Sequence, residues 1–298
     1  MKNFNSKLKK FSAVLCGVGI MCSGFALAGC GESADPHAGK IEVIGTETTY
    51  VDTWADAVKS LNDGVTIKLH KDVELGETFD VPYTITIDGM GKYTIKAGEN
   101  VGEDYAQLIR INTKDRKVLT LKDVKIDANR KGRAVRVDNN NGLVVNGATI
   151  TGGYMEDSYA TGVYVTKAGT FTMTSGQITG NKIGGTKYAD KYYAIYSQDL
   201  WVGANANGEL NSTITGGKIG YMFVNANSYS ETNPGKFVME NGHIENVWVE
   251  YGNGYGATFE YKAGQIDTLR VSKTTEGEFE VVTPVAGTTY VGGTSYNA

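Results

Sequence analysis

One pattern of apolar and polar positions recurs along the chain. Each copy begins with an apolar residue, any residue and a second apolar residue, although one copy departs from this at one position. An isoleucine lies seven positions after the first residue of the copy, and Gly or Asn often follows it. The six isoleucines are Ile126, Ile150, Ile178, Ile219, Ile244 and Ile266. The copies begin 22 to 28 residues apart, except for one interval of 41. The period-two alternation predicts strands that bury one face, and the interval suits one coil of a parallel β-solenoid.

Other features support a solenoid with covered ends. Glycine makes up 39 of the 298 residues, and Gly or Asn can adopt the left-handed conformations that sharp corners need. A leucine-rich repeat has a similar period, but its leucine ladder with Asn or Cys is absent from every copy. Residues 53–61 predict a short amphipathic helix at the N-terminal end, with Thr53 as N-cap. The pattern fades over 274–298, which predicts a last strand pair and a frayed tail.

The repeats resemble a known superfamily when they are read with two earlier stretches, VTIKLHKDVEL from Val65 and YTITIDGMGKYTIKAG from Tyr83. Together they resemble the right-handed parallel β-helix superfamily that includes pectate lyases, and more closely its repeat-type surface proteins. The resemblance implies an all-β fold, a right-handed parallel β-helix solenoid of about eight to ten coils with a short N-terminal capping helix. It implies no single activity, because the superfamily includes lyases, hydrolases, adhesins and inert spacers.

Residues 1–29 have the pattern of a signal peptide. Four lysines precede an apolar run from Phe11 to Ala28, as in secretory signals, although a run of this length could also span a membrane. The following Leu27-Ala28-Gly29-Cys30 resembles the lipobox of bacterial lipoproteins. That resemblance implies transfer of a diacylglyceryl group to the Cys30 thiol, with palmitate among the acyl chains, cleavage before Cys30, and an extracytoplasmic location on the bacterial cell envelope. Residues 30–40 would then form a polar tether, and 41–298 the β-helix domain.

The composition and the net charge limit the kinds of partner and cofactor that the chain is expected to bind. Loss of the signal removes four of 29 basic residues and leaves 25 against 33 acidic ones. An acidic chain without basic clusters argues against nucleic acid. Cys16 and Cys22 would leave with the signal, so no disulfide could form beside a lipidated Cys30. The three histidines are scattered without a second ligand at metal-site spacing, so neither a metal nor a cofactor is expected.

The strongest catalytic candidate is the segment from Asp127 to Asp138. Its carboxylates and arginines could bind a uronate and abstract a proton, as in the β-helical polysaccharide lyases that this chain resembles. Those enzymes need calcium-binding carboxylates, or a base with a basic residue, on neighbouring coils. The next coil offers Gly, Thr and Tyr over residues 161–166. A solvated loop of weak ion pairs is the simpler interpretation, and a small polysaccharide lyase or hydrolase is an alternative function.

The second strand of each coil predicts a column of outward side chains. In aligned triplets with apolar flanks, the middle residue points away from the core, and successive rungs lie about 4.8 Å apart. The predicted column is Arg136, Tyr164, Tyr196, Phe223, Trp248 and Arg270. Two interpretations stay open. The column is either an aromatic ladder that stabilises the sheet, which the insertion between Asn181 and Ser212 could cover, or an exposed binding face.

The leading functional expectation follows from the exposed form of this column. Sugar rings present apolar C–H faces that lie well on Tyr and Trp, and stacked rungs match the repeat of a polymer. The chain is therefore expected to be a membrane-anchored surface lipoprotein that binds an extended ligand, a polysaccharide or another cell-surface ligand, without catalysis. A structural or adhesive surface protein that recognises another protein is the third hypothesis.

Overall fold

The computed structural model describes residues 35–294 except 103–105, 167, 204–211, 227–235, 253 and 275–276. These residues belong to the second of two compact units, Asp35–Ala298. The predicted signal peptide and Cys30 therefore lie outside the described residues. Among the residues that are described, no helix has the length and apolar character needed to cross a membrane.

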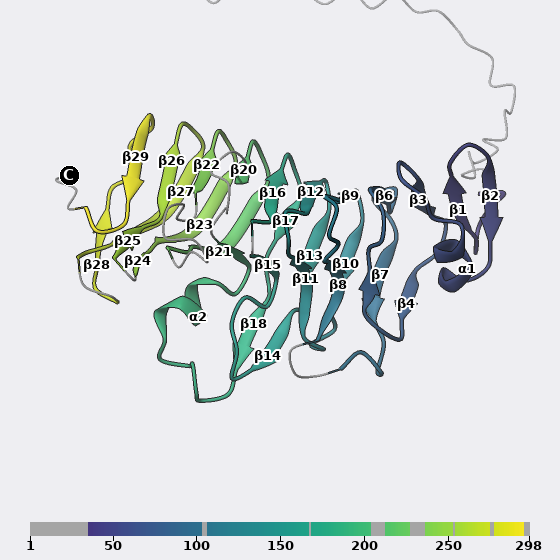
Figure 1. Cartoon of the computed structure of the whole chain (residues 1–298), viewed down its shortest axis with the longest axis horizontal. Coiled ribbons are helices and arrows are strands. Elements are labelled where there is room, and N and C mark those ends of the chain that lie inside the picture. Colours follow the sequence, from purple (N-terminus) through teal and green to yellow (C-terminus); the bar gives the residue numbers. More distant parts are fainter. Residues whose placement is uncertain are drawn as a thin grey trace, which may run out of the picture. The chain divides into compact units, whose positions relative to one another are not determined.

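The unit is a parallel β-solenoid of about seven turns, in which strands from successive turns lie side by side (Figure 1). One sheet of eleven strands runs along it within the described ranges. Its order is β2 (Thr48–Val51), β1 (Ile41–Ile44), β3 (Thr66–Leu69), β6 (Ile85–Asp88), β9 (Val118–Lys122), β12 (Gly142–Asn146), β16 (Thr170–Met173), β20 (Ser212–Ile214), β22 (Lys236–Met239), β26 (Thr258–Tyr261) and β29 (Thr288–Val291).

A second sheet carries the remaining strands of each turn, and in the first half of the solenoid these form two separate rows. One row is β4 (Val73–Leu75), β7 (Thr94–Ala97), β10 (Lys125–Asp127), β13 (Thr149–Thr151) and β17 (Gln177–Ile178). The other is β5 (Phe79–Asp80), β8 (Gln107–Ile111), β11 (Arg133–Val137), β15 (Val163–Val165) and β19 (Leu200–Val202). The rows then merge into the long strands β21 (Lys218–Val224), β23 (His243–Val249) and β27 (Gln265–Ser272), and β28 (Phe279–Val282) ends the sheet.

The remaining elements are short. Helix α1 (Trp54–Lys59) lies within the predicted range, and the Thr53 hydroxyl caps it by accepting a hydrogen bond from the Asp56 backbone N–H at 3.1 Å. Two small sheets pair β14 (Tyr154–Glu156) with β18 (Lys182–Gly184) and β24 (Tyr251–Gly252) with β25 (Tyr255–Gly256). Helix α2 (Tyr192–Tyr196) lies on the same side of the solenoid as β14 and β18 (Figure 1).

The isoleucine register predicted from the repeats is confirmed. Consecutive isoleucines of the six pair directly with one another, from Ile126 to Ile266, and Ile95 adds a seventh at the start of the stack. All are buried in the main core. Burial of one Ile side chain contributes roughly 1.5–3 kcal/mol relative to exposure, so this stack both stabilises the coils and fixes their register.

The ends of the solenoid explain why it has about seven turns rather than eight to ten. At one end β1 pairs antiparallel with both β2 and β3, and at the other β28 and β29 pair antiparallel with β27 and β26. These strands cover the ends without adding coils. The expected last strand pair therefore exists, but its members close two different sheets, and strand structure reaches Val291 within the segment expected to fray.

Residues 35–40, which we expected to form part of a tether, pack against the first turn. The His37 ring stacks on the Tyr50 ring, with centroids 3.9 Å apart and planes 13° from parallel. The Asp35 carboxylate contacts His70 Nδ1 at 2.6 Å. The chain is thus held to the domain five residues after the predicted lipidation site at Cys30.

His70 is buried between two carboxylates. Its Nδ1 faces Asp35, and its Nε2 lies 3.1 Å from Glu42 Oε2. Both ring nitrogens can donate together only in the imidazolium form. Burial alone lowers the pKa of His70, but the hydrogen bonds to Asp35 and Glu42 outweigh it, so the pKa is raised above 6.5.

We predict that this site makes stability fall as the pH rises above about 6.5. Because the folded state binds the His70 proton more tightly than the unfolded chain, the contribution is complete below about pH 6.5 and is lost as the pH rises through the raised pKa. Replacement of His70 by Gln should cost about 1–3 kcal/mol in mild acid and flatten this decline in thermal melting.

His243→Gln is the matched control, because His243 pairs with Asp267 at the surface, at 2.9 Å. The His243→Gln variant should lose stability with rising pH to the same extent as the wild type. Equal pH profiles for wild type and His70→Gln would contradict the assignment.

Candidate functional site

The predicted outward column exists, and strand pairing defines its members. The middle residues of successive strands pair in the order Asp80, Arg110, Arg136, Tyr164, Trp201, Phe223, Trp248, Arg270 and Val281. Five of the six predicted members, Arg136, Tyr164, Phe223, Trp248 and Arg270, therefore lie in one column. The structure adds Asp80 and Arg110 before them, Trp201 within them and Val281 after them.

The assignment of Tyr196 to the column was wrong. Tyr196 is the last residue of α2, and its place in the column belongs to Trp201 of β19. The triplet Ile195-Tyr196-Ser197 has an apolar residue on only one side of its middle residue, whereas Leu200-Trp201-Val202 has one on both sides. The spacing of Tyr192, Ile195 and Tyr196 is helical, a signal that sequence alone could have supplied.

The expectation of an exposed aromatic face is also wrong for the middle of the column. Trp248 is 1% exposed, Phe223 is fully buried, and Trp201 is 8% exposed. Residues 182–199, here called the cap segment, fold over these rings together with Tyr159. Of the two interpretations left open by the sequence, the covered ladder is therefore the one that the structure supports.

The cap segment is attached by aromatic and polar contacts. The Tyr192 ring stacks on Trp248 with centroids 4.5 Å apart, and its hydroxyl donates to the buried Glu250 at 3.1 Å. The Arg270 guanidinium lies 4.7 Å from the centroid of the Tyr196 ring. These contacts, with those of Tyr159 on Trp201, form a small second core.

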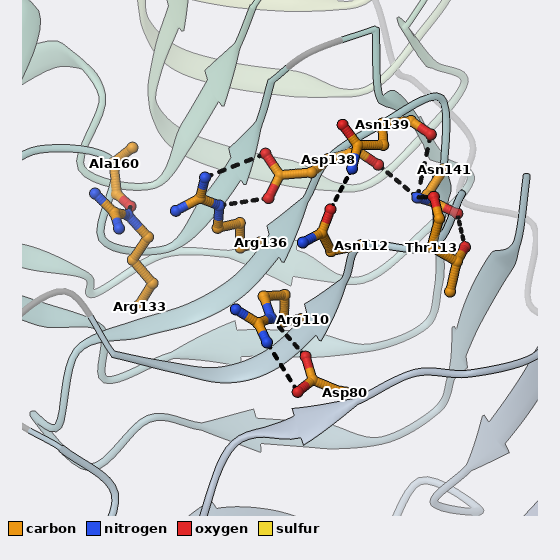
Figure 2. Close-up of polar contacts among 10 residues, drawn as sticks. All are labelled: Asp80, Arg110, Asn112, Thr113, Arg133, Arg136, Asp138, Asn139, Asn141 and Ala160. Carbon is orange, nitrogen blue, oxygen red and sulfur yellow. Dashed lines mark hydrogen bonds and ion pairs between the residues drawn. The ribbon is translucent and has the colours of Figure 1, made fainter. Parts of the chain in front are cut away.

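The N-terminal end of the column remains open to solvent. Arg110 and Arg136 lie on neighbouring strands, with side chains 38% and 27% exposed, and Tyr164 follows on the next strand, half-buried. Figure 2 shows each arginine in a bidentate pair, Arg110 with Asp80 and Arg136 with Asp138, and the Nη2–O distances are 2.9 and 3.2 Å. Each pair uses Nε and Nη2 of the arginine, so Nη1 remains able to donate to a ligand.

The segment proposed as a catalytic candidate makes local contacts instead of a shared site. Asp127 ends β10 and pairs with Lys125 at 2.9 Å, while Asp138 follows β11 in the other row and is buried against Arg136. Arg133 is buried and donates from Nε to the Ala160 carbonyl at 3.0 Å. The acidic and basic groups therefore stabilise a corner of the solenoid.

A polar pocket of about 370 Å³ lies beside the cap segment, where the two rows of the second sheet merge. It is lined by Gln177, Thr179, Gly180, Asn181, Lys182, Gln198, Asp199, Lys218, Gly220, Tyr221 and Glu245. Among the described residues, no group of three or more His, Cys, Asp or Glu is placed to hold a metal ion.

Asp199 is the buried acid of this pocket. Its Oδ1 accepts hydrogen bonds from the Asn181 side chain at 2.8 Å and the Asn181 backbone N–H at 3.2 Å, and its Oδ2 accepts from the Tyr221 backbone N–H at 2.9 Å. Burial raises the pKa of the Asp199 carboxyl to about 6, and these hydrogen bonds oppose the shift. Asp199 thus fixes the end of the cap segment and keeps a carboxylate inside the pocket.

A second carboxylate faces the same space. Glu245 Oε1 pairs with Lys218 Nζ at 2.6 Å on the neighbouring strand. A Cβ on Gly220 would lie 2.4 Å from Asp199 Oδ2 and 3.8 Å from Glu245 Oε2. Glycine at position 220 therefore lets the Asp199 carboxylate pack directly against strand β21, with Glu245 close by. The residues of this site are dispersed over several coils and belong to no motif, so no pattern in the sequence points to it.

Comparisons with known proteins identify no relative. No protein-family model, no curated protein and no solved structure matches the chain. The fold is therefore established by its own strand pairing, and any function must be argued from the geometry of the column and the pocket.

We predict that Trp248→Ala destabilises the domain strongly. The indole is buried under Tyr192, and its Nε1 donates to the Ser272 hydroxyl at 2.7 Å, so truncation should cost about 3–5 kcal/mol in chemical unfolding. Truncation of the half-buried Tyr164 at the open end should cost less. A loss below about 0.5 kcal/mol for Trp248→Ala, the size usual for a surface change, would show that the ring is exposed.

Proposed function

We propose that the protein is a bacterial envelope lipoprotein, acylated at Cys30, whose β-solenoid belongs to the pectate-lyase-like β-helix superfamily. We further propose that it binds an extended glycan without catalysis at the open end of the column. The lipobox sequence Leu27-Ala28-Gly29-Cys30 after a basic and apolar run supports the anchor. The parallel stacking of the coils is consistent with the superfamily.

The observation that carries the binding proposal is the open end itself. Arg110, Arg136 and Tyr164 occupy successive rungs, and their side chains are only partly buried. The Arg136 guanidinium lies 5.5 Å from the centroid of the Tyr164 ring. Rungs about 4.8 Å apart therefore offer a polymer a regular series of donors that ends at an aromatic ring.

The charge of this surface favours a neutral glycan. Each arginine is matched by a carboxylate, Arg110 by Asp80 and Arg136 by Asp138, so the surface has little net charge. It retains the donors and acceptors that sugar hydroxyls require, and Tyr164 can pack on the apolar face of a ring. Non-catalytic binding is favoured because these carboxylates are held by arginines.

We predict that Arg110→Ala weakens glycan binding by about 1–2 kcal/mol, roughly tenfold. Its partner Asp80 is 59% exposed, so the variant should keep its stability within about 0.5 kcal/mol. The full chain in detergent should first be screened on a glycan array, and the glycans that bind should be measured by calorimetry.

Arg130→Ala is the control for this change, because Arg130 is an exposed arginine whose guanidinium lies 4.0 Å from the centroid of the Tyr154 ring, away from the column. It should bind like the wild type. Absence of any glycan ligand, or equal binding by Arg110→Ala and wild type, would overturn the binding proposal.

We predict that Cys30→Ala abolishes lipid labelling of the protein in cells, because the acylated thiol is removed. The precursor should also keep residues 1–29, since the lipoprotein peptidase acts on the lipidated cysteine of a lipobox. Metabolic labelling with a fatty-acid analogue and the mass of the product measure both effects. Continued acylation of the variant would contradict the anchor assignment.

A further inference from the structure

The pocket around Asp199 and Glu245 has features of a binding site that are independent of the open end. Its volume of about 370 Å³ lies at the lower end of the range for small-molecule pockets, about 300–1,000 Å³. It contains a carboxylate that is 2% exposed, positioned by three hydrogen bonds. From these features we propose that the pocket binds a neutral, hydroxyl-rich ligand the size of a sugar ring.

Charge balance is the first argument for this ligand class. The charged lining residues are two of each sign, Lys182 and Lys218 against Asp199 and Glu245. An anionic ligand would meet two carboxylates, and a metal ion would meet the Lys218 ammonium, which lies 2.6 Å from Glu245. A ligand without net charge is the class that this lining accommodates.

The uncharged lining supplies the second argument. Three amide or hydroxyl side chains, Gln177, Thr179 and Gln198, line the pocket with donors and acceptors. Asn181 also lines it, but its amide group donates to Asp199 and to the Ile150 carbonyl. The half-buried Tyr221 adds one aromatic ring, whose centroid lies 6.2 Å from that of Tyr196 in the cap segment. A sugar ring combines hydroxyls at its edge with an apolar face, which matches both parts of this lining.

The third argument is that the two carboxylates lie close together beside Gly220. The ideal Cβ position of Gly220 is 2.4 Å from Asp199 Oδ2 and 3.8 Å from Glu245 Oε2, so a side chain there would displace the Asp199 carboxylate. One ligand hydroxyl can donate to Asp199 while its neighbour donates to Glu245. The pair of carboxylates thus selects adjacent hydroxyls.

The test uses the full chain in detergent and four neutral sugars: glucose, galactose, mannose and N-acetylglucosamine. Saturation-transfer NMR and calorimetry should detect binding of at least one of them. Glu245→Gln should weaken that binding tenfold or more, and Gly220→Ala should abolish it. The thermal stability of both variants should be measured first.

Glu245 is the better position for the main test because its side chain is 36% exposed and pairs with a lysine at the surface, so its loss costs little stability.

Glu240→Gln is the matched control, because Glu240 forms a similar surface pair with Lys262 at 3.2 Å outside the pocket. It should bind like the wild type, as should Arg110→Ala, which separates this site from the open end of the column. Three results would overturn the inference: no binding of any of the four sugars, equal affinity of Glu245→Gln and Glu240→Gln, or calcium binding to the wild type that Glu245→Gln removes.

Discussion

Parallel pairing between successive coils holds this protein together, because each strand leaves backbone N–H and C=O groups that only its neighbours in the stack can satisfy. Such pairing tolerates no slip, since a shift of one residue would turn every buried side chain outward. The isoleucine stack fixes the register by filling the same core position in each turn. Antiparallel strands then close both ends, where an unpaired edge would otherwise remain.

The same register determines what the surface can do. Because inward positions repeat from coil to coil, outward positions repeat as well, and they form a column that runs from Asp80 to Val281. The cap segment divides this column. It buries Trp201, Phe223 and Trp248 in a second core, and it leaves the arginine and tyrosine end open. Asp199 holds the C-terminal end of the cap segment, so the contact that attaches the cap segment also places a carboxylate in the neighbouring pocket.

The sequence was sufficient to predict the strand register where one spacing held in every copy of the repeat, as it did for the isoleucines. The rule of apolar flanks, applied strictly, would also have chosen Leu200-Trp201-Val202, which has apolar residues on both flanks, over Ile195-Tyr196-Ser197, which has one. The tetrapeptide Thr-Thr-Tyr-Val shows where sequence alone is insufficient. It forms β2 and β29, the two end strands of one sheet, yet Tyr50 is 42% exposed and Tyr290 is 2% exposed. The strand that each copy pairs with decides which face turns inward.

The central claim is that strand register places the tryptophans of the column beneath the cap segment, and the most direct test is the fluorescence of Trp201 and Trp248 in a Trp54→Phe variant. Trp54 is half-buried against Phe79 in the first turn, so its replacement leaves the two column tryptophans as the only tryptophans of the chain, and they can be excited selectively over tyrosine. We expect short-wavelength emission and weak quenching by acrylamide, as for indoles shielded from water. Long-wavelength emission with quenching as strong as that of the unfolded chain would contradict the central claim.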